Sequence, residues 1–286
     1  MIKGSIVAII TPFKDNKIDF NALEKLISWH LESGTKAITV AGTTGESPVL
    51  SRDEYTDLIS FVLNKVAGKI SVIAGTGSNS TSASIEKTVL AKKLGADAAL
   101  VVVPYYNKPT QEGLYLHFKT IHDNSDIPII LYNVPGRTIT DLADDTVARL
   151  AELKRVVGIK DATADISRLT NLRNLISRED FCYLSGDDAT TYEYIKHGGD
   201  GAISVTANVY PKEVAMLCDY ALAQEYTKAE EINSSLVKIN KDLFVEPNPI
   251  PVKWLLYKLG KISNEIRLPL TCLSTKHHNL FGEFDA

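Results

Sequence analysis

The chain has 286 residues, of which 44% are hydrophobic and 23% are charged, and both fractions are ordinary for a soluble globular protein. Its formal net charge of −4 argues against electrostatic attraction to nucleic acid or to a membrane surface. No apolar run reaches the length of a membrane span, and the N-terminus lacks the features of a secretory signal, so we expect a cytoplasmic protein.

Short apolar runs rich in β-branched residues recur eight times along the chain. They cover residues 5–10, 37–42, 70–75, 99–106, 127–135, 156–163, 181–188 and 201–208. Amphipathic segments with helical spacing lie between the runs, and the clearest cover residues 20–33 and 52–68. We expect Asp19 to cap the first of these helices and Gly34 to end it.

Eight apolar runs alternating with helices predict an α/β protein with a (β/α)8 TIM barrel, because parallel strands buried on both faces read as unbroken apolar runs. A doubly wound open sheet is the alternative, but it typically has five or six strands, and no G-x-G-x-x-G motif follows the first run. Helical segments 210–223, 226–244 and 249–260 follow the last run, and only the first can be the eighth barrel helix. We therefore predict a barrel over residues 1–224 and a C-terminal helical appendix over 225–286, packed on the barrel.

The cysteines and histidines give no sign of a metal site. Cys182, Cys218 and Cys272 form no C-x-x-C pair, and we expect three buried thiols in a reducing compartment. The active site of an α/β barrel forms at the C-terminal ends of the strands, and no histidine or carboxylate cluster closes the apolar runs. We therefore expect no metal ion and no other cofactor.

Lys160 is the most informative residue that closes a run. Burial inside a barrel strand disfavours the ammonium form, and a neutral amine is the nucleophile that converts a ketone into an imine. The other interpretation is a buried lysine paired with Asp161 or Asp187, and the sequence alone leaves both open.

Three further features surround this position in the predicted barrel. Tyr132 closes the neighbouring strand, where a phenol can relay protons or simply cap the core. Arg137, in the predicted loop 133–138, is either a bidentate clamp for a carboxylate or a solvated surface residue. The turn G42-T43-T44-G45-E46 offers hydroxyl and N–H groups to a carboxylate, although the motif is weak by itself.

Several motifs together resemble the dihydrodipicolinate synthase family. They are GTTGE at 42–46, PYYN at 104–107, YNVPGRT at 132–138, GIKDAT at 158–163, SGDD at 185–188, GAISVTANV at 201–209 and FVEPNPIPVKW at 244–254. The resemblance runs from about Gly4 to about Leu270. The wider family, which includes N-acetylneuraminate lyase, is similar at the Thr-rich turn, the Tyr and the Lys. The GRT loop and the EPNPIPVK segment favour the synthase.

The resemblance implies a reaction and its catalytic residues. Pyruvate would form a Schiff base on Lys160 and then attack L-aspartate 4-semialdehyde, giving 4-hydroxy-tetrahydrodipicolinate on the route to diaminopimelate and lysine. Tyr132, Thr43 and Tyr106 would relay protons, with Tyr106 reaching the neighbouring subunit's site. A homotetramer built from two dimers is the assembly that the resemblance implies, with no nucleic acid or membrane partner.

Substrate-binding residues also follow from the resemblance. Thr44 would hold the pyruvate carboxylate, and Arg137 would hold the carboxylate of the semialdehyde. Gly186 and Ile203 would line the pocket through their backbone carbonyls.

The chain departs from the family pattern in two places. Residues matching a lysine feedback site are kept at Ser47, Asn79 and Tyr105. Arg52 and Tyr55 stand where lysine-sensitive members often have other residues, and Ala83 stands where they have a glutamate. That glutamate would pair with the ammonium group of lysine, and its loss costs about 2 kcal/mol of binding free energy. We therefore predict weak or absent inhibition by lysine. The tail after Pro269 looks shortened or altered and is expected to be irregular.

Two other functions remain open at this point. A related aldolase could cleave sialic acid or a keto-deoxy sugar acid, but such an enzyme has no need of Arg137 at this place. The chain could also be a catalytically silent barrel that acts as a regulator. Such a barrel would be indicated by the loss of Lys160 or Tyr132, but both residues are present.

Overall fold

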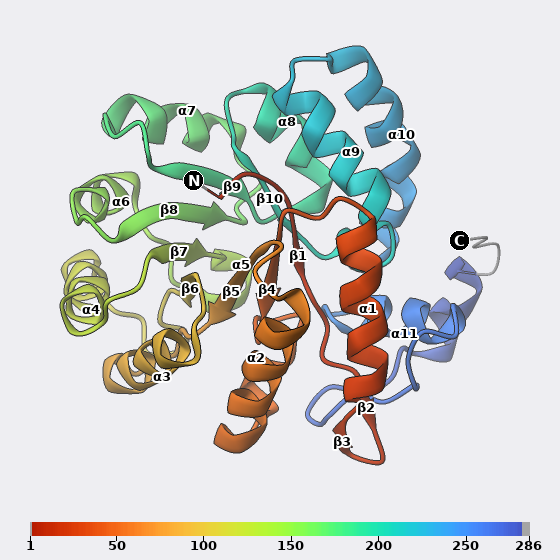
Figure 1. The fold of residues 1–286 in the computed structure, drawn as a ribbon. Coiled ribbons are helices and arrows are strands. Elements are labelled where there is room, and N and C mark those ends of the chain that lie inside the picture. Colours follow the sequence, from red (N-terminus) through yellow and green to blue (C-terminus); the bar gives the residue numbers. More distant parts are fainter. Residues whose placement is uncertain (1, 282–286) are drawn as a thin grey trace.

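The computed structural model describes residues 2–281 and contains a closed barrel of parallel strands ringed by helices (Figure 1). Around the barrel the strands follow the order β1-β10-β9-β8-β7-β6-β5-β4, and each of the eight predicted runs overlaps one of them. The predicted (β/α)8 fold is therefore confirmed. The barrel strands are β1 (Gly4–Ala8), β4 (Ala37–Val40), β5 (Ser71–Gly75), β6 (Ala98–Val102), β7 (Ile129–Asn133), β8 (Val156–Asp161), β9 (Cys182–Ser185) and β10 (Gly201–Ser204).

Five of the helices listed below, α1, α2, α3, α4 and α7, begin after a residue whose side chain caps the first turn. Asp19 accepts a hydrogen bond from the Ala22 amide at the start of the first helix, as predicted, and Ser51 and Glu54 form a capping box at the second. The helices are α1 (Phe20–Glu32), α2 (Arg52–Val66), α3 (Thr81–Leu94), α4 (Gln111–Asn124), α5 (Pro135–Thr138), α6 (Asp144–Ala151), α7 (Ile166–Leu175), α8 (Thr191–Lys196), α9 (Pro211–Leu222), α10 (Tyr226–Asp242) and α11 (Ile250–Lys258). Short 3₁₀ helices are η1 (Ser47–Val49), η2 (Asp188–Thr190), η3 (Thr206–Asn208) and η4 (Thr275–Phe281).

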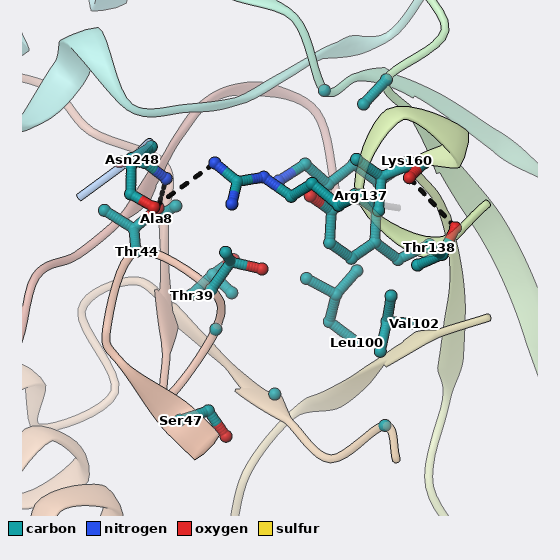
Figure 2. A pocket seen from close by; sticks show the side chains of 18 of the residues that line it. Ala8, Thr39, Thr44, Ser47, Leu100, Val102, Arg137, Thr138, Lys160 and Asn248 are labelled. Carbon is teal, nitrogen blue, oxygen red and sulfur yellow. Dashed lines mark hydrogen bonds between the residues drawn. The ribbon is translucent and has the colours of Figure 1, made fainter. Parts of the chain in front are cut away.

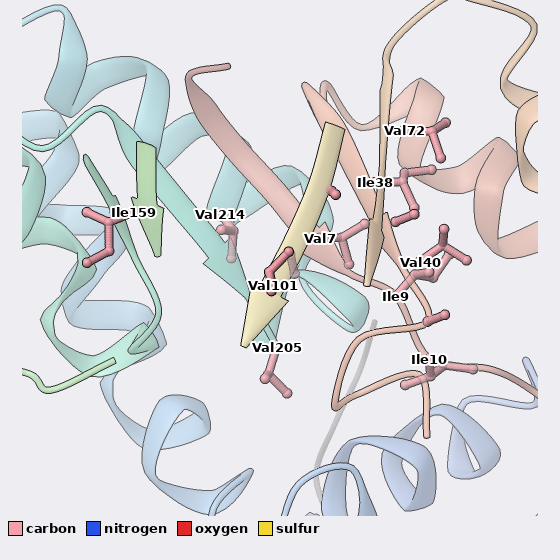
Figure 3. Close-up of a cluster of buried hydrophobic side chains, with 14 of the residues drawn as sticks. Val7, Ile9, Ile10, Ile38, Val40, Val72, Val101, Ile159, Val205 and Val214 are labelled. Carbon is pink, nitrogen blue, oxygen red and sulfur yellow. The ribbon is translucent and has the colours of Figure 1, made fainter. Parts of the chain in front are cut away.

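Side-chain alternation along the strands divides the core into two layers. Outward-facing residues such as Val7, Ile38 and Ile159 pack against the helices (Figure 3), and each buried aliphatic side chain of this size contributes about 1.5–3 kcal/mol. A second cluster, which includes Ile6 and Leu184, fills the inside of the barrel. Residues between the outward-facing ones must therefore point into the barrel, and Lys160 is one of them.

The C-terminal segment returns to the start of the chain. Helix α10 packs on α9 and α8, while α11 and the residues after it lie near a hairpin of β2 (Phe13–Lys14) and β3 (Lys17–Ile18) that the sequence did not predict (Figure 1). The Glu265 carboxylate accepts hydrogen bonds from the amides of Asp15 and Asn16 at the tip of this hairpin. The division between barrel and appendix at residue 224 stays a prediction.

Two expectations for the C-terminal segment hold only in part. In the described part of the tail, residues 271–274 are irregular as expected, but residues 275–281 form η4, and His278 stacks on the Trp254 ring with 3.8 Å between ring centroids. Residues 282–286 of the predicted tail lie outside the described part. Cys272 is exposed, whereas Cys182 and Cys218 are buried as expected. Within residues 2–281, none of the helices combines the length and the apolar character needed to cross a membrane.

Candidate active site

A cavity of about 420 Å³ opens where the strands end (Figure 2). Its wall brings together six of the eight predicted catalytic and substrate-binding residues, from strands and loops far apart in the sequence. They are Thr43, Thr44, Tyr132, Arg137, Lys160 and Gly186.

Lys160 and Tyr132 are direct neighbours in this wall. They are paired across the β7–β8 ladder, so both side chains point to the same face of the sheet. The lysine is only 5% exposed, and its Nζ lies 4.3 Å from the centroid of the Tyr132 ring. The predicted proximity of amine and phenol is thus present.

The carboxylates that could have paired with Lys160 are engaged elsewhere. Asp161 points to the opposite face of β8, where its Oδ2 lies 3.0 Å from Nε of Arg168. Burial raises the pKa of the Asp161 carboxyl, and the nearby Arg168 charge opposes that rise. Asp187 accepts hydrogen bonds from the amide and hydroxyl of Thr190. Among the described residues no ion pair of Lys160 is found, which favours the nucleophile over the buried salt bridge.

Gly186 provides the space that the Lys160 side chain occupies. A Cβ atom at residue 186 would lie 2.8 Å from Cβ of Ala162 and 3.0 Å from Cε of Lys160. Contacts under about 3.4 Å are tighter than packed carbon atoms allow, so any larger residue would displace the lysine.

The Thr43–Thr44 turn is closed by backbone hydrogen bonds and held from outside. The Glu46 amide donates to the Thr43 carbonyl over 3.1 Å, and Thr44 is buried. Nδ2 of Asn248 donates to the Thr44 Oγ1 over 3.0 Å (Figure 2). Because that oxygen acts as an acceptor there, the hydroxyl proton of Thr44 is available to a ligand carboxylate.

Arg137 reaches across the cavity mouth from a single helical turn. The predicted loop at residues 133–138 was wrong in part, because Pro135 begins the short helix α5, which carries Arg137. The exposed guanidinium donates from Nη2 to the backbone carbonyl of Asn248 over 3.3 Å. Its other N–H groups are therefore available to an anion in the cavity.

The other predicted site residues lie apart from the cavity or in its wall. Tyr106 is 87% exposed with a φ of +76° and does not line the cavity of its own chain. Ile203 belongs to the buried cluster inside the barrel, and Val205 lines the cavity instead. Ser47 and Tyr105, predicted as remnants of the lysine site, also line the cavity. The backbone carbonyl of Asn79 accepts a hydrogen bond from the Asn107 side chain.

The positions that depart from the family pattern lie in helices α2 and α3. Tyr55 is buried, its hydroxyl donates to the Gly75 carbonyl over 3.0 Å, and burial raises the pKa of its phenol. Arg52 begins α2, and Ala83 lies in the first turn of α3. Tyr55 is thus part of the core and is not available to a ligand.

Sequence reasoning missed Asn248, Phe244 and Lys87, which also line the cavity. Asn248 and Phe244 fall within the segment EPNPIPVK or just before it, so the segment that supported the resemblance was itself the available signal. Lys87 lies on α3 with no pattern to distinguish it from a surface lysine.

The fold and the cavity define the class of protein: a (β/α)8-barrel enzyme with a lysine-centred site at the C-terminal ends of its strands. Within the described residues, no cluster of three or more His, Cys, Asp or Glu side chains could hold a metal ion. The family follows from comparison with known proteins.

Residues 1–284 match the model of the dihydrodipicolinate synthetase family, and this chain belongs to that family. The 4-hydroxy-tetrahydrodipicolinate synthase of Pseudomonas putida is 54% identical over 279 residues, covering 97% of this chain and 95% of the relative. That of Laribacter hongkongensis is 52% identical over 275 residues, covering 96% and 94%. The chloride-inhibited dihydrodipicolinate synthase from Acinetobacter baumannii, solved in complex with pyruvate, has a TM-score of 0.97 and 49% identity, covering 99% of this chain and 97% of that one. The resemblance stated from the motifs is confirmed.

Proposed function

We propose that this chain condenses pyruvate with L-aspartate 4-semialdehyde to give 4-hydroxy-tetrahydrodipicolinate, and that it does so through a Schiff base on Lys160. The observation that carries the proposal is the buried Lys160 amine beside Tyr132, without a carboxylate partner among residues 2–281, in a family of synthases. Relatives about half identical over nearly the whole chain carry the name of that synthase.

The chemistry follows from the positions of these groups. Nζ of Lys160 attacks the ketone carbon of pyruvate, and loss of water leaves an imine. Removal of a methyl proton gives an enamine, whose carbon forms a bond to the aldehyde carbon of the semialdehyde. The amino group of the semialdehyde then attacks the imine carbon, which closes the ring and releases Lys160. Tyr132, whose ring lies beside the amine, is assigned the proton transfers.

Each substrate carboxylate has an assigned binding group. The hydroxyl of Thr44 donates to the pyruvate carboxylate, since Asn248 already satisfies its oxygen as an acceptor. The guanidinium of Arg137 binds the semialdehyde carboxylate at the mouth of the cavity, and its contact with the Asn248 carbonyl holds it there. The backbone carbonyl of Gly186 faces the bound pyruvate adduct.

The active assembly contains more than one chain. Tyr106 is exposed and is held away from its own cavity, which fits a side chain that completes the site of a neighbouring subunit, with Thr43 passing on the proton. We assign the protein to a homotetramer of two such dimers in the cytoplasm.

Reduction with borohydride in the presence of pyruvate tests the central step. Peptide mapping should place a pyruvate-sized adduct on Lys160, and the Lys160→Ala variant should give none. A folded wild-type protein without an adduct would refute the Schiff base.

Complementation tests the shared tyrosine. Lys160→Ala and Tyr106→Phe subunits, each poorly active alone, should regain activity when they are unfolded and refolded together. A hybrid dimer then holds one site with both Lys160 and the partner's tyrosine. If the refolded mixture shows only the summed activity of the two variants, Tyr106 does not complete the site of a neighbouring subunit.

A further inference from the structure

A buried ion pair joins helix α11 to the turn that carries Thr43 and Thr44. Nζ of Lys253 lies 2.5 Å from Oε1 of Glu46, and the side chains are 4% and 1% exposed. Lys253 also donates to the Thr11 carbonyl over 3.0 Å, and the Arg267 amide donates to the second oxygen of Glu46, Oε2, over 3.0 Å. Both charges are thus paired and hydrogen-bonded, although the two residues lie 207 positions apart in the sequence.

Stability alone does not account for this pair. Removing two ions from water costs several kcal/mol per ion, and apolar residues of similar volume often serve a fold equally well. The pair instead fixes Glu46, whose φ of +55° places a non-glycine residue in the left-handed region. The Glu46 amide closes the turn on the Thr43 carbonyl. The ion pair therefore holds the residue that ends the turn in an otherwise unfavourable conformation.

Asn248, just before helix α11, attaches the C-terminal segment to the cavity through two hydrogen bonds. Its side chain donates to Thr44, while its backbone carbonyl accepts from Arg137. The side chain thus contacts the group assigned to pyruvate, and the main chain contacts the group assigned to the semialdehyde. Changing the side chain leaves the second contact in place.

We propose that Glu46, Lys253 and Asn248 are positioning residues that hold the Thr43–Thr44 turn in place for the pyruvate carboxylate. The proposal rests on the function proposed above and extends it to residues outside the reacting centre. It makes the C-terminal segment part of the pyruvate site, and it predicts an effect on pyruvate that is separate from any effect on the semialdehyde.

The first test uses Asn248→Ala. The pyruvate concentration that half-saturates borohydride trapping should rise about tenfold, the factor for one misplaced hydrogen-bond donor. The KM for the semialdehyde should stay within about twofold, because the Arg137 contact is made by the main chain. An unchanged pyruvate requirement, or an equal rise for both substrates, would overturn the proposal.

The second test separates positioning from folding. Lys253→Met leaves the buried Glu46 carboxylate without its cation and should lower both the melting temperature and the affinity for pyruvate. The double variant Glu46→Met, Lys253→Met removes both charges and should recover the melting temperature but not the affinity. If the double variant also regains wild-type affinity, the pair is only structural and the proposal is refuted. Should Lys253→Met fail to fold, Asn248→Ala and the double variant decide.

A matched control lies at the other end of the barrel. Asp200→Ala removes a mostly buried carboxylate that pairs with Lys3 and accepts from the Tyr183 amide. It should lower the melting temperature without changing the pyruvate requirement, and a raised requirement there would refute the specific role of the turn. If borohydride traps no pyruvate adduct on the wild-type protein, the proposed function itself is refuted. If the adduct forms but Asn248→Ala leaves its pyruvate dependence unchanged, only this inference is refuted.

Discussion

Replacing Gly186 with alanine tests whether the space around Lys160 limits the reaction. The new methyl would lie 2.8 Å from Cβ of Ala162, 3.0 Å from Cε of Lys160 and 3.1 Å from the Asp161 carbonyl. Ordinary carbon contacts begin near 3.4 Å, so the lysine must move by a few tenths of an ångström, about 0.4 Å. Overpacking of this kind costs about 1–3 kcal/mol of stability, and a nucleophile displaced by that distance loses about tenfold in rate.

The assay for Gly186→Ala is the rate of borohydride-trapped adduct formation at saturating pyruvate, measured together with urea unfolding. Gly113→Ala is the matched control, because its new Cβ would approach other atoms no closer than 3.4 Å in helix α4. Alanine there should leave the trapping rate unchanged and stabilise the helix by up to about 1 kcal/mol. Wild-type trapping by a folded Gly186→Ala protein would refute the steric reasoning.

Three other changes probe charge. Burial lowers the pKa of His30 to about 3, against 6.5 for an unperturbed histidine, so its contribution to stability is complete above pH 6.5 and is lost as the pH falls towards 3. The loss reaches about 2–3 kcal/mol at pH 4.5, and urea unfolding of His30→Gln should lack that part of the pH dependence. Arg137→Lys removes bidentate binding and should raise the KM for the semialdehyde about tenfold while pyruvate trapping stays normal; a parallel rise for pyruvate would count against the assignment. L-lysine added to the steady-state assay should inhibit weakly or not at all, because Ala83 supplies no carboxylate for its ammonium group, and tight inhibition would contradict this.

Local patterns in the sequence were enough to predict the elements that form the barrel. An unbroken apolar run is typical of a strand that is buried on both faces of a parallel sheet. Asp19 marks the start of α1, because its side chain accepts a hydrogen bond from an amide of the first turn. In a (β/α)8 barrel the C-terminal ends of the strands lie together, which is why Lys160, Tyr132 and Thr44 could be grouped from the sequence alone. The β2–β3 hairpin was missed although Asp15 and Asn16, both with positive φ, form the kind of turn that such residues favour.

The contacts of the C-terminal segment could not be derived in the same way. Nothing near Lys253 in the sequence shows that its partner is Glu46, since a lysine on an apolar helix usually reaches solvent. The tail was expected to be irregular because it has no apolar periodicity. Residues 275–281 instead form η4, and His278 stacks on Trp254, a tertiary contact with no local signature.

Net charge and local charge lead to different conclusions for this protein. The whole chain carries −4, which weighed against polyanionic partners, yet the described residues of the cavity wall include the basic side chains Lys87 and Arg137, besides the nucleophile Lys160, and one acidic side chain, Asp187. Low-dielectric walls concentrate the field of such groups, so the basic side chains favour anions in the cavity although the chain as a whole is acidic. Both proposed substrates carry a carboxylate. The local excess of basic side chains therefore explains how an acidic chain can offer a cavity suited to two carboxylates.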